Sequence, residues 1–222
     1  MIDFIFMLTR HDQTIEDCLE TFDSIARLGL RHVGFKDVGV DRATLEELNR
    51  RIKDSGATSY MEVVSETADS CLASARTAAE IGVDRLLGGT DAESILPLLK
   101  GTGIGYFPFP GRPEGHPTLL GGTPDQVEDH CRRYAALGCA GVDLLAYRAT
   151  EADPLDLVRA ARRATPGTLI VAGSVDSPER IKALEDAGAD AFTIGSAVFD
   201  GSFSRRKGMM ASQVKDVLAA CA

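Results

Sequence analysis

Short apolar runs of strand length alternate with amphipathic helical patterns eight times along this chain. The expected strands span residues 3–9, 32–37, 58–64, 84–87, 103–107, 141–146, 168–172 and 191–194. Repeated strand–helix units predict a parallel sheet, because each helix returns the chain along one face to start the next strand. Eight such units in a chain of 222 residues favour a closed barrel over an open sheet.

The predicted helix ends support this alternation. A glycine that ends a helix leads directly into the next strand at Gly29, Gly82, Gly138 and Gly188. Helix starts are expected at Thr14, Asp41, Thr123, Asp153 and Ser177. Residues 123–126 read Thr-Pro-Asp-Gln, which is a capping box with proline at the first helical position. The sequence therefore predicts an α/β fold, a single (β/α)8 TIM barrel domain over residues 1–222.

The composition argues against several classes of function. The formal net charge of −9 disfavours nucleic acid or an anionic membrane as the main partner, although a local site can still bind an anion. Five cysteines without a Cys-x-x-Cys motif predict reduced thiols and a cytoplasmic location. Cys18, Cys71 and Cys131 fall within predicted helices and are expected to pack in the core. The chain begins at once with a strand and has no apolar run of membrane-spanning length, so we expect neither a signal peptide nor a membrane span.

The last two predicted strands both end in the dipeptide Gly-Ser. Gly173-Ser174 follows the seventh strand, and Gly195-Ser196 follows the eighth. Glycine lets backbone N–H groups approach an anion closely, and a helix start adds a positive dipole. Because a (β/α)8 barrel commonly binds phosphate after these two strands, we predict a phosphate site here. The alternative explanation is that these glycines are ordinary loop residues with no role in binding.

A similar pattern occurs one half-barrel earlier. Gly82-x-Asp84 with Gly89-Thr90 matches Gly188-x-Asp190 with Gly195-Ser196 at a constant offset, since 188 − 82 and 195 − 89 both equal 106. The match is expected of a barrel built from two four-stranded halves. It predicts a second, weaker anion site at Gly89 and Thr90, with chance similarity between strand–helix units as the equal alternative.

The C-terminal quarter resembles the ribulose-phosphate-binding barrels. The resemblance lies in Gly-Ser-Val-x-Ser at residues 173–177, Ala-Gly-Ala-Asp at 187–190 and Ile-Gly-Ser-Ala at 194–197. With Phe-Asp-Gly-Ser-Phe at 199–203, the chain is most similar to the histidine-biosynthesis phosphoribosyl isomerases. The resemblance implies that phosphate binds at Gly173, Ser174, Gly195 and Ser196.

The catalytic residues of those isomerases are not carried over. The family uses one aspartate at the end of strand one and another at the end of strand five. Strand one here reads Phe-Met-Leu-Thr at residues 6–9, with Asp12 displaced into the loop. Strand five reads Gly-Tyr-Phe-Pro at 105–108 and has no carboxylate.

Three residues of the predicted strands point to acid–base chemistry. Side chains alternate along a strand, so Val33 and Phe35 would face the helices while Lys36 faces the barrel lumen. The same alternation turns Glu62 and Asp143 inward. Charged groups at strand ends require partners when they are buried, so Lys36 and Glu62 on neighbouring strands are expected to pair, for structure or for catalysis. Asp12 is a further acid–base candidate.

Other candidates for substrate contact lie in loops. Residues 108–122 form a long segment rich in proline and glycine, typical of an active-site lid, which holds Arg112 and His116. These two residues would meet the substrate there, and a solvated loop is the equal alternative. Arg10 follows strand one and Tyr147 follows strand six, so both are expected at the mouth, and Arg148 comes next in that loop. His130 falls within a helix and is expected to be a packing or surface residue.

We expect an enzyme that acts on a small phosphorylated sugar or keto compound. An isomerase or epimerase would use Glu62 or Asp143 as the base and Lys36 to polarise a carbonyl. A Schiff-base aldolase or lyase would instead form an imine on Lys36. A non-catalytic phospho-ligand-binding barrel is the third hypothesis, although binding alone does not require a lysine and two carboxylates around one mouth.

The expected partner is thus a small phosphorylated molecule. The sequence indicates no cofactor and contains no evident metal-ligand triad, although a carboxylate-bound Mg²⁺ stays open. The identity of the substrate and the oligomeric state, a homo-oligomer included, also stay open.

Overall fold

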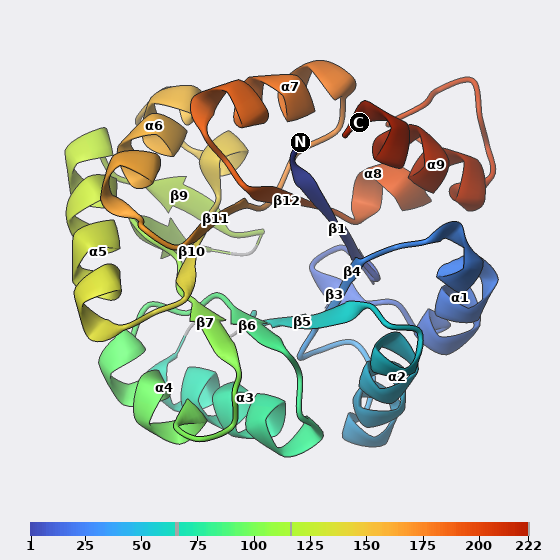
Figure 1. Ribbon diagram of the computed structural model, residues 1–222, viewed down its shortest axis with the longest axis horizontal. Coiled ribbons are helices and arrows are strands. Elements are labelled where there is room, and N and C mark those ends of the chain that lie inside the picture. Colours follow the sequence, from blue (N-terminus) through green and yellow to red (C-terminus); the bar gives the residue numbers. More distant parts are fainter. Residues whose placement is uncertain (65–66, 116, 222) are drawn as a thin grey trace.

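Eight parallel strands surround a central lumen in the computed structural model, which describes residues 1–64, 67–115 and 117–221 (Figure 1). They are β1 (Asp3–Met7), β4 (His32–Lys36), β5 (Thr58–Glu62), β6 (Arg85–Leu87), β7 (Gly105–Phe107), β10 (Gly141–Leu144), β11 (Thr168–Val171) and β12 (Ala191–Ile194). Their spatial order is β10-β11-β12-β1-β4-β5-β6-β7. In the described part of the chain, two backbone hydrogen bonds link the outermost strands, β7 and β10: Ala140 N–H donates to Tyr106 O (3.0 Å) and Asp143 N–H to Pro108 O (3.1 Å). The sheet is therefore a nearly closed TIM barrel, as predicted.

Helices lie outside this ring, between successive strands (Figure 1). They are α1 (Cys18–Ile25), α2 (Arg42–Asp54), α3 (Ala68–Ile81), α4 (Ala92–Leu99), α5 (Pro124–Leu137), α6 (Pro154–Ala164), α7 (Pro178–Ala187), α8 (Ser196–Phe199) and α9 (Met210–Ala220). Among the described residues, no helix is both long and apolar enough to cross a membrane.

The alternation of side chains along the strands divides the core into two parts. Val33 and Phe35 belong to the larger cluster between strands and helices, whereas Met7, Tyr60 and Phe107 belong to the small cluster in the lumen. The inward and outward faces predicted for β4 and β5 are thus confirmed. Lys36 and Glu62 lie on the inward face, each the last residue of its strand.

Most predicted helix ends are confirmed. The Asp41, Thr123, Asp153 and Ser177 side chains accept backbone hydrogen bonds at helix starts, and Thr123 and Gln126 complete the capping box. Thr14 is the exception. It lies in β3 (Gln13–Thr14), which pairs with β2 (Thr9–Arg10), and α1 begins later, at Cys18. Its hydroxyl group instead accepts from Lys36 N–H and donates to Lys36 O, at 2.8 Å each, so tertiary pairing with β4 replaces the cap.

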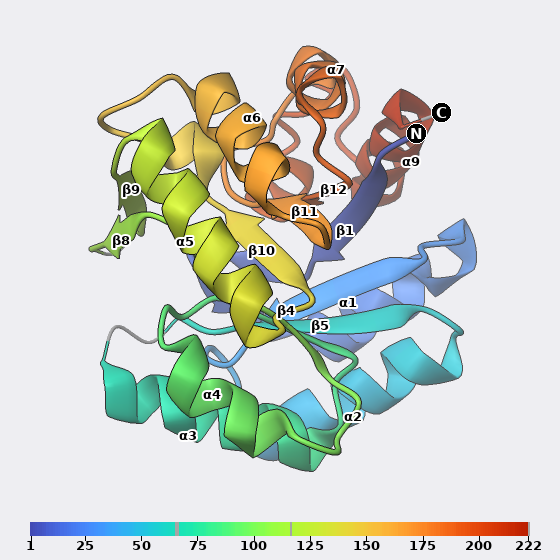
Figure 2. The same ribbon diagram turned by 60° about the vertical axis from the view of Figure 1, so that its left-hand side comes forward.

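The segment after β7 also differs from the prediction, because it has regular structure of its own. β8 (Arg112–Glu114) and β9 (Leu119–Gly121) form an antiparallel hairpin. Figure 2 shows this hairpin beside α5, and Arg112 Nη1 donates to Gln126 Oε1 on that helix at 3.1 Å. The segment is therefore a hairpin that is hydrogen-bonded to α5. His116 lies outside the described residues.

The match between Gly82-x-Asp84 and Gly188-x-Asp190 in the sequence has a structural basis at the start of two strands. Asp190 Oδ2 accepts from Leu169 N–H at 2.7 Å, and Asp84 Oδ2 accepts from Ser59 N–H at 2.9 Å. Each carboxylate thus completes the start of the preceding parallel strand in the ring and meets a nearby cation, Arg162 or Lys53. This shared role explains the aspartates of the repeated motif by their position at the N-terminal ends of the strands.

These two aspartates can be tested by their stability. Asp190→Ala and Asp84→Ala each leave a backbone N–H of the sheet without its charged acceptor, so we expect each to lower the free energy of unfolding by about 1.5–3 kcal/mol. Urea unfolding measures the loss. Asp186→Ala removes an exposed ion pair with Lys182 and is the control, with an expected change below about 0.5 kcal/mol. Equal effects for all three variants would contradict the structural role.

Candidate active site

A cavity of about 320 Å³ opens at the C-terminal ends of the barrel strands. Lys36, Glu62, Asp12 and Arg148 line one part of it, and both Gly-Ser turns line another. The structure therefore brings residues from separate parts of the chain, from Asp12 to Ser196, into one site. This end of the barrel is where enzymes with this fold carry out their chemistry.

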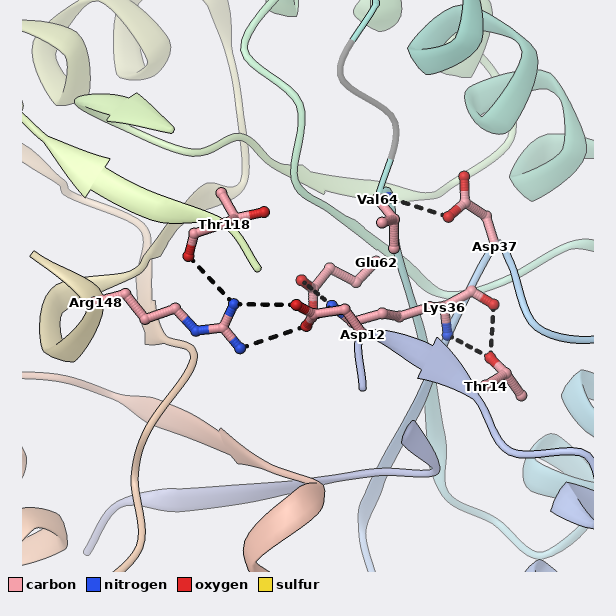
Figure 3. A network of polar contacts seen from close by, with 8 residues as sticks. All are labelled: Asp12, Thr14, Lys36, Asp37, Glu62, Val64, Thr118 and Arg148. Atoms are coloured by element: carbon pink, nitrogen blue, oxygen red, sulfur yellow. Dashed lines mark hydrogen bonds and ion pairs between the residues drawn. The ribbon is translucent and has the colours of Figure 1, made fainter. Parts of the chain in front are cut away.

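The Lys36 ammonium lies between two carboxylates. Its Nζ is 2.8 Å from Asp12 Oδ1 and 3.1 Å from Glu62 Oε1 (Figure 3). The register of β4 and β5 sets Lys36 directly opposite Glu62, which fixes one half of the arrangement. About a tenth or less of each of these three side chains is exposed, between 8% and 11%.

The loop between β2 and β3 supplies the other half. His11 and Asp12 have φ values of 51° and 57°, in the left-handed region that residues with a Cβ seldom adopt. This turn folds the loop back so that the Asp12 carboxylate reaches Lys36. The sequence indicated that Asp12 follows strand one, but not that it would enter an ion cluster with Lys36.

Arg148 also contacts Asp12, whereas the sequence predicts only that it lies in the loop after strand six. It ends a short 3₁₀ turn, Ala146–Arg148, that follows β10. Nη1 and Nη2 each lie 3.4 Å from a different oxygen of Asp12, and Nη1 also donates to Thr118 O at 3.3 Å. Figure 3 shows Arg148 on one side of the Asp12 carboxylate, with Lys36 and Glu62 on the other.

The cluster fixes the charge of its members. Burial acts to lower the pKa of Lys36, but the carboxylates of Glu62 and Asp12 outweigh it and hold that pKa above its ordinary value. Burial likewise acts to raise the pKa of Asp12, but Lys36 and then Arg148 lower it to about 2. At neutral pH the site therefore contains an ammonium group and an ionised Asp12.

Asp143 lies in the lumen outside this ion network. Its side chain is fully buried, and neither carboxyl oxygen has a hydrogen-bond partner among the described residues. Burial, followed by the charge of Glu62, raises the pKa of Asp143 well above its ordinary value. We conclude that it is a neutral carboxylic acid, and it does not line the cavity that Lys36 and Glu62 share.

The two Gly-Ser turns have different local constraints. Gly173 and Ser174 have φ values of 79° and 57°, so the chain turns sharply where β11 ends. Gly195 approaches the start of β2: a Cβ there would lie 2.7 Å from Thr9 Oγ1 and 2.8 Å from Thr9 O. Ser174 and Ser196 are both exposed and line the cavity.

Arg10 and Tyr147 lie near this part of the cavity without lining it. Arg10 pairs with Asp200, one of the lining residues, at 2.6 Å. The guanidinium carbon of Arg180 lies 4.7 Å from the centre of the Tyr147 ring, and Arg180 also pairs with Asp176 at 3.1 Å. Both predicted residues thus belong to the surroundings of the cavity.

Other predicted residues lie elsewhere. Gly89, Thr90 and Arg112 line a second cavity of about 580 Å³ between α5 and the hairpin. Arg112 is engaged there by Glu151, at 2.5 Å. His130 also lines it, and its Nδ1 accepts from Gly111 N–H at 3.1 Å. In the part of the chain that the structure describes, no group of three or more His, Cys, Asp or Glu side chains is arranged to hold a metal ion.

Comparison with solved structures places the chain among TIM barrels. A structure described as "Native KDPGal structure" superposes with a TM-score of 0.68 at 15% identity, covering 98% of this chain and 95% of the other. The α-subunit of tryptophan synthase from Pyrococcus furiosus, in a mutant form, gives 0.65 at 15% identity, with 98% of each chain covered. Identity at this level shows the fold alone. No protein-family model matches the chain, and no curated protein matches it significantly.

The neutral state of Asp143 predicts a particular dependence of stability on pH. A carboxyl group whose pKa is raised on folding stabilises the folded state fully below its unfolded pKa, about 3.9, and loses that contribution as the pH rises through the folded value. Asp143→Asn keeps the shape of the neutral acid but cannot ionise. We therefore expect the variant to gain stability relative to the parent protein as the pH rises from about 4 to about 7, by at most about 1.4 kcal/mol per pH unit.

Urea unfolding of both proteins across this pH range measures the difference. Asp186→Asn, at an exposed position, is the control and is expected to track the parent protein at every pH. A constant difference between Asp143→Asn and the parent protein would show that Asp143 has an ordinary pKa.

Proposed function

We propose that this chain is an enzyme that transfers a proton next to the carbonyl group of a small phosphorylated sugar or keto compound, as an isomerase or epimerase does. The observation on which the proposal depends is the Lys36 ammonium, fixed 2.8 and 3.1 Å from two carboxylates in a cavity that two Gly-Ser turns also line. The resemblance of these turns to the phosphate loops of the ribulose-phosphate-binding barrels supports the substrate class.

Each residue then has a defined part in the reaction. An ammonium group has three N–H donors, and Asp12 and Glu62 engage two of them, which leaves one for a carbonyl oxygen. Glu62, or Asp12 once it is less strongly paired, takes the proton from the carbon beside the carbonyl. The electron pair of that C–H bond forms a new carbon–carbon double bond while the π pair of the carbonyl moves to its oxygen, and Lys36 stabilises the resulting enediolate.

In an isomerase, the same carboxyl group returns the proton to the former carbonyl carbon, while the proton of the adjacent hydroxyl group moves to the former carbonyl oxygen. In an epimerase, the second carboxyl group must be in its protonated form, and it delivers that proton to the opposite face of the same carbon. No atom is gained or lost in either case. The two carboxylates on either side of Lys36 suit both reactions.

A Schiff-base aldolase or lyase is the second candidate, since Lys36 is a buried lysine at the mouth of a barrel. Imine formation requires the neutral amine. The two carboxylates hold the pKa of Lys36 above its ordinary value and so oppose deprotonation. This charge state favours the proton-transfer hypothesis over the imine hypothesis.

The exchange of substrate hydrogen for solvent deuterium tests the chemistry. We expect one or more ketose or aldose phosphates to exchange the hydrogen beside the carbonyl in D₂O, observed by NMR. Lys36→Met should slow this exchange by about a hundredfold or more, and Glu62→Gln by a similar factor, because each removes a group that acts in the transition state. Lys100→Met, at an exposed position after α4, is the matched control. Undiminished exchange in Lys36→Met would refute the proposal, and substrate covalently attached after borohydride reduction would establish the aldolase.

Thermal shift tests the phosphate site separately. A ligand that binds the folded state raises Tm by mass action, so a sugar phosphate should raise it more than inorganic phosphate does. Ser196→Asp places a negative charge in the first cavity and should abolish the rise. Thr90→Asp does the same in the second cavity and should leave it unchanged. The reverse pattern would place the phosphate at Gly89 and Thr90 instead.

A further inference from the structure

Arg148 is held in its observed position by weak contacts. Its two contacts with Asp12 are both 3.4 Å long, and its contact with Thr118 O is 3.3 Å, whereas Lys36 lies 2.8 Å from the same Asp12 carboxylate. Hydrogen bonds between an arginine and a carboxylate are normally shorter, at about 2.7–2.9 Å. The guanidinium group is therefore near Asp12 without being tightly bound to it.

The other side of Arg148 faces the phosphate loops. A Cβ on Gly173 would lie 2.4 Å from Arg148 Nε and 2.9 Å from its Cδ, so the arginine lies directly across this turn. Any side chain at position 173 would displace it. Among the described residues, Arg148 donates hydrogen bonds from Nη1 and Nη2 but none from Nε. Arg148 also lines the same cavity as Gly173 and Ser196. Arg148 thus has one donor toward the predicted phosphate position and two toward Asp12.

We propose that Arg148 serves two partners in turn: it neutralises Asp12 before the phosphate arrives, and it shifts to the phosphate when that group occupies the Gly173 and Gly195 turns, which frees Asp12 to accept a proton. The substrate thereby activates the carboxylate that acts on it. This inference rests on the proposed phosphate site and adds to it a positioning residue that couples binding to proton transfer.

The charges around Asp12 make such coupling effective. Lys36 on β4 and Arg148 after β10 are the two cations of the cluster, while Glu62 on β5, Asp143 on β10, and Asp176 and Asp200 on the cavity wall are the acidic groups on the neighbouring elements. Lys36 pairs with Glu62 as well as with Asp12, so its departure would leave Glu62 without that cation. Arg148 can move away from Asp12 without this consequence. Its departure raises the pKa of Asp12, which burial already acts to raise.

A double-mutant cycle with sulfate as the probe tests the coupling. Sulfate is a dianion at neutral pH, and calorimetry there measures its affinity for the whole protein. Arg148→Gln should weaken sulfate binding about tenfold, because a charged hydrogen-bond donor is lost. Asp12→Asn should strengthen it about tenfold, because Arg148 is no longer divided between two anions. In the Arg148→Gln background, Asp12→Asn should change the affinity by less than about twofold.

Glu62→Gln is the matched control. It removes the other carboxylate paired with Lys36 but does not touch Arg148, so its effect on sulfate affinity should be equal in both backgrounds. Circular dichroism checks that each variant folds. If Arg148→Gln does not fold, Arg148→Lys replaces it: this variant keeps the charge but loses the forked geometry, so its affinity for sulfate should be intermediate. As a second readout, sulfate should raise the pKa of Asp12, followed by ¹³C NMR of its carboxyl group, more in the parent protein than in the Arg148 variant.

Two outcomes would overturn the inference. If Asp12→Asn strengthens sulfate binding by the same factor with and without Arg148, the anion site stands but the coupling is wrong. If the parent protein binds neither sulfate nor inorganic phosphate, the phosphate site of the proposed function is wrong as well, and the role of Arg148 fails with it.

Discussion

The buried ammonium group of Lys36 is the interaction on which the site depends. A charge removed from water in this way costs several kcal/mol unless it is paired in good geometry. Two features of the fold provide the pairing: the register of β4 and β5, which sets Glu62 opposite, and the left-handed turn before β3, which brings in Asp12. Arg148 balances the second carboxylate. Among the described residues, the third carboxyl group of the lumen, Asp143, has no hydrogen-bond partner, and burial together with the charge of Glu62 holds its pKa well above the ordinary value.

Features set by local chemistry could be predicted from the sequence. The eight strands, the caps of α2 and α5 and the direction of Lys36 and Glu62 follow from apolar periodicity, capping chemistry and alternation along a strand. The pairing of Lys36 with Glu62 could be predicted as well, since neighbouring parallel strands end at the same edge of the sheet.

Features set by tertiary contacts could not be predicted. The position of Asp12 depends on φ values near +55° at two non-glycine residues, and no sequence pattern indicates them. Thr14 looks like a helix cap but binds the backbone of Lys36 instead. The segment after β7 contains Pro113 and few β-branched residues, which conceals its hairpin. The aspartates of the repeated Gly-x-Asp motif lie at the starts of strands, at the end of the barrel opposite the cavity, so their repetition reflects sheet construction. The anion site at Gly89 and Thr90 stays a prediction, and both residues line the second cavity.

The barrel wall is weakest at the junction between β7 and β10. Elsewhere around the ring, neighbouring strands form continuous parallel ladders, but two backbone hydrogen bonds in the described chain join this pair. Hydrogen exchange should therefore be fastest along this line when the barrel opens locally. The hairpin and α5 follow β7 and connect to β10, and they form the wall of the larger cavity. A partial opening of the ring between β7 and β10 would thus widen the larger cavity while the smaller one, which lies over the ladders from β10 through β5, keeps its shape.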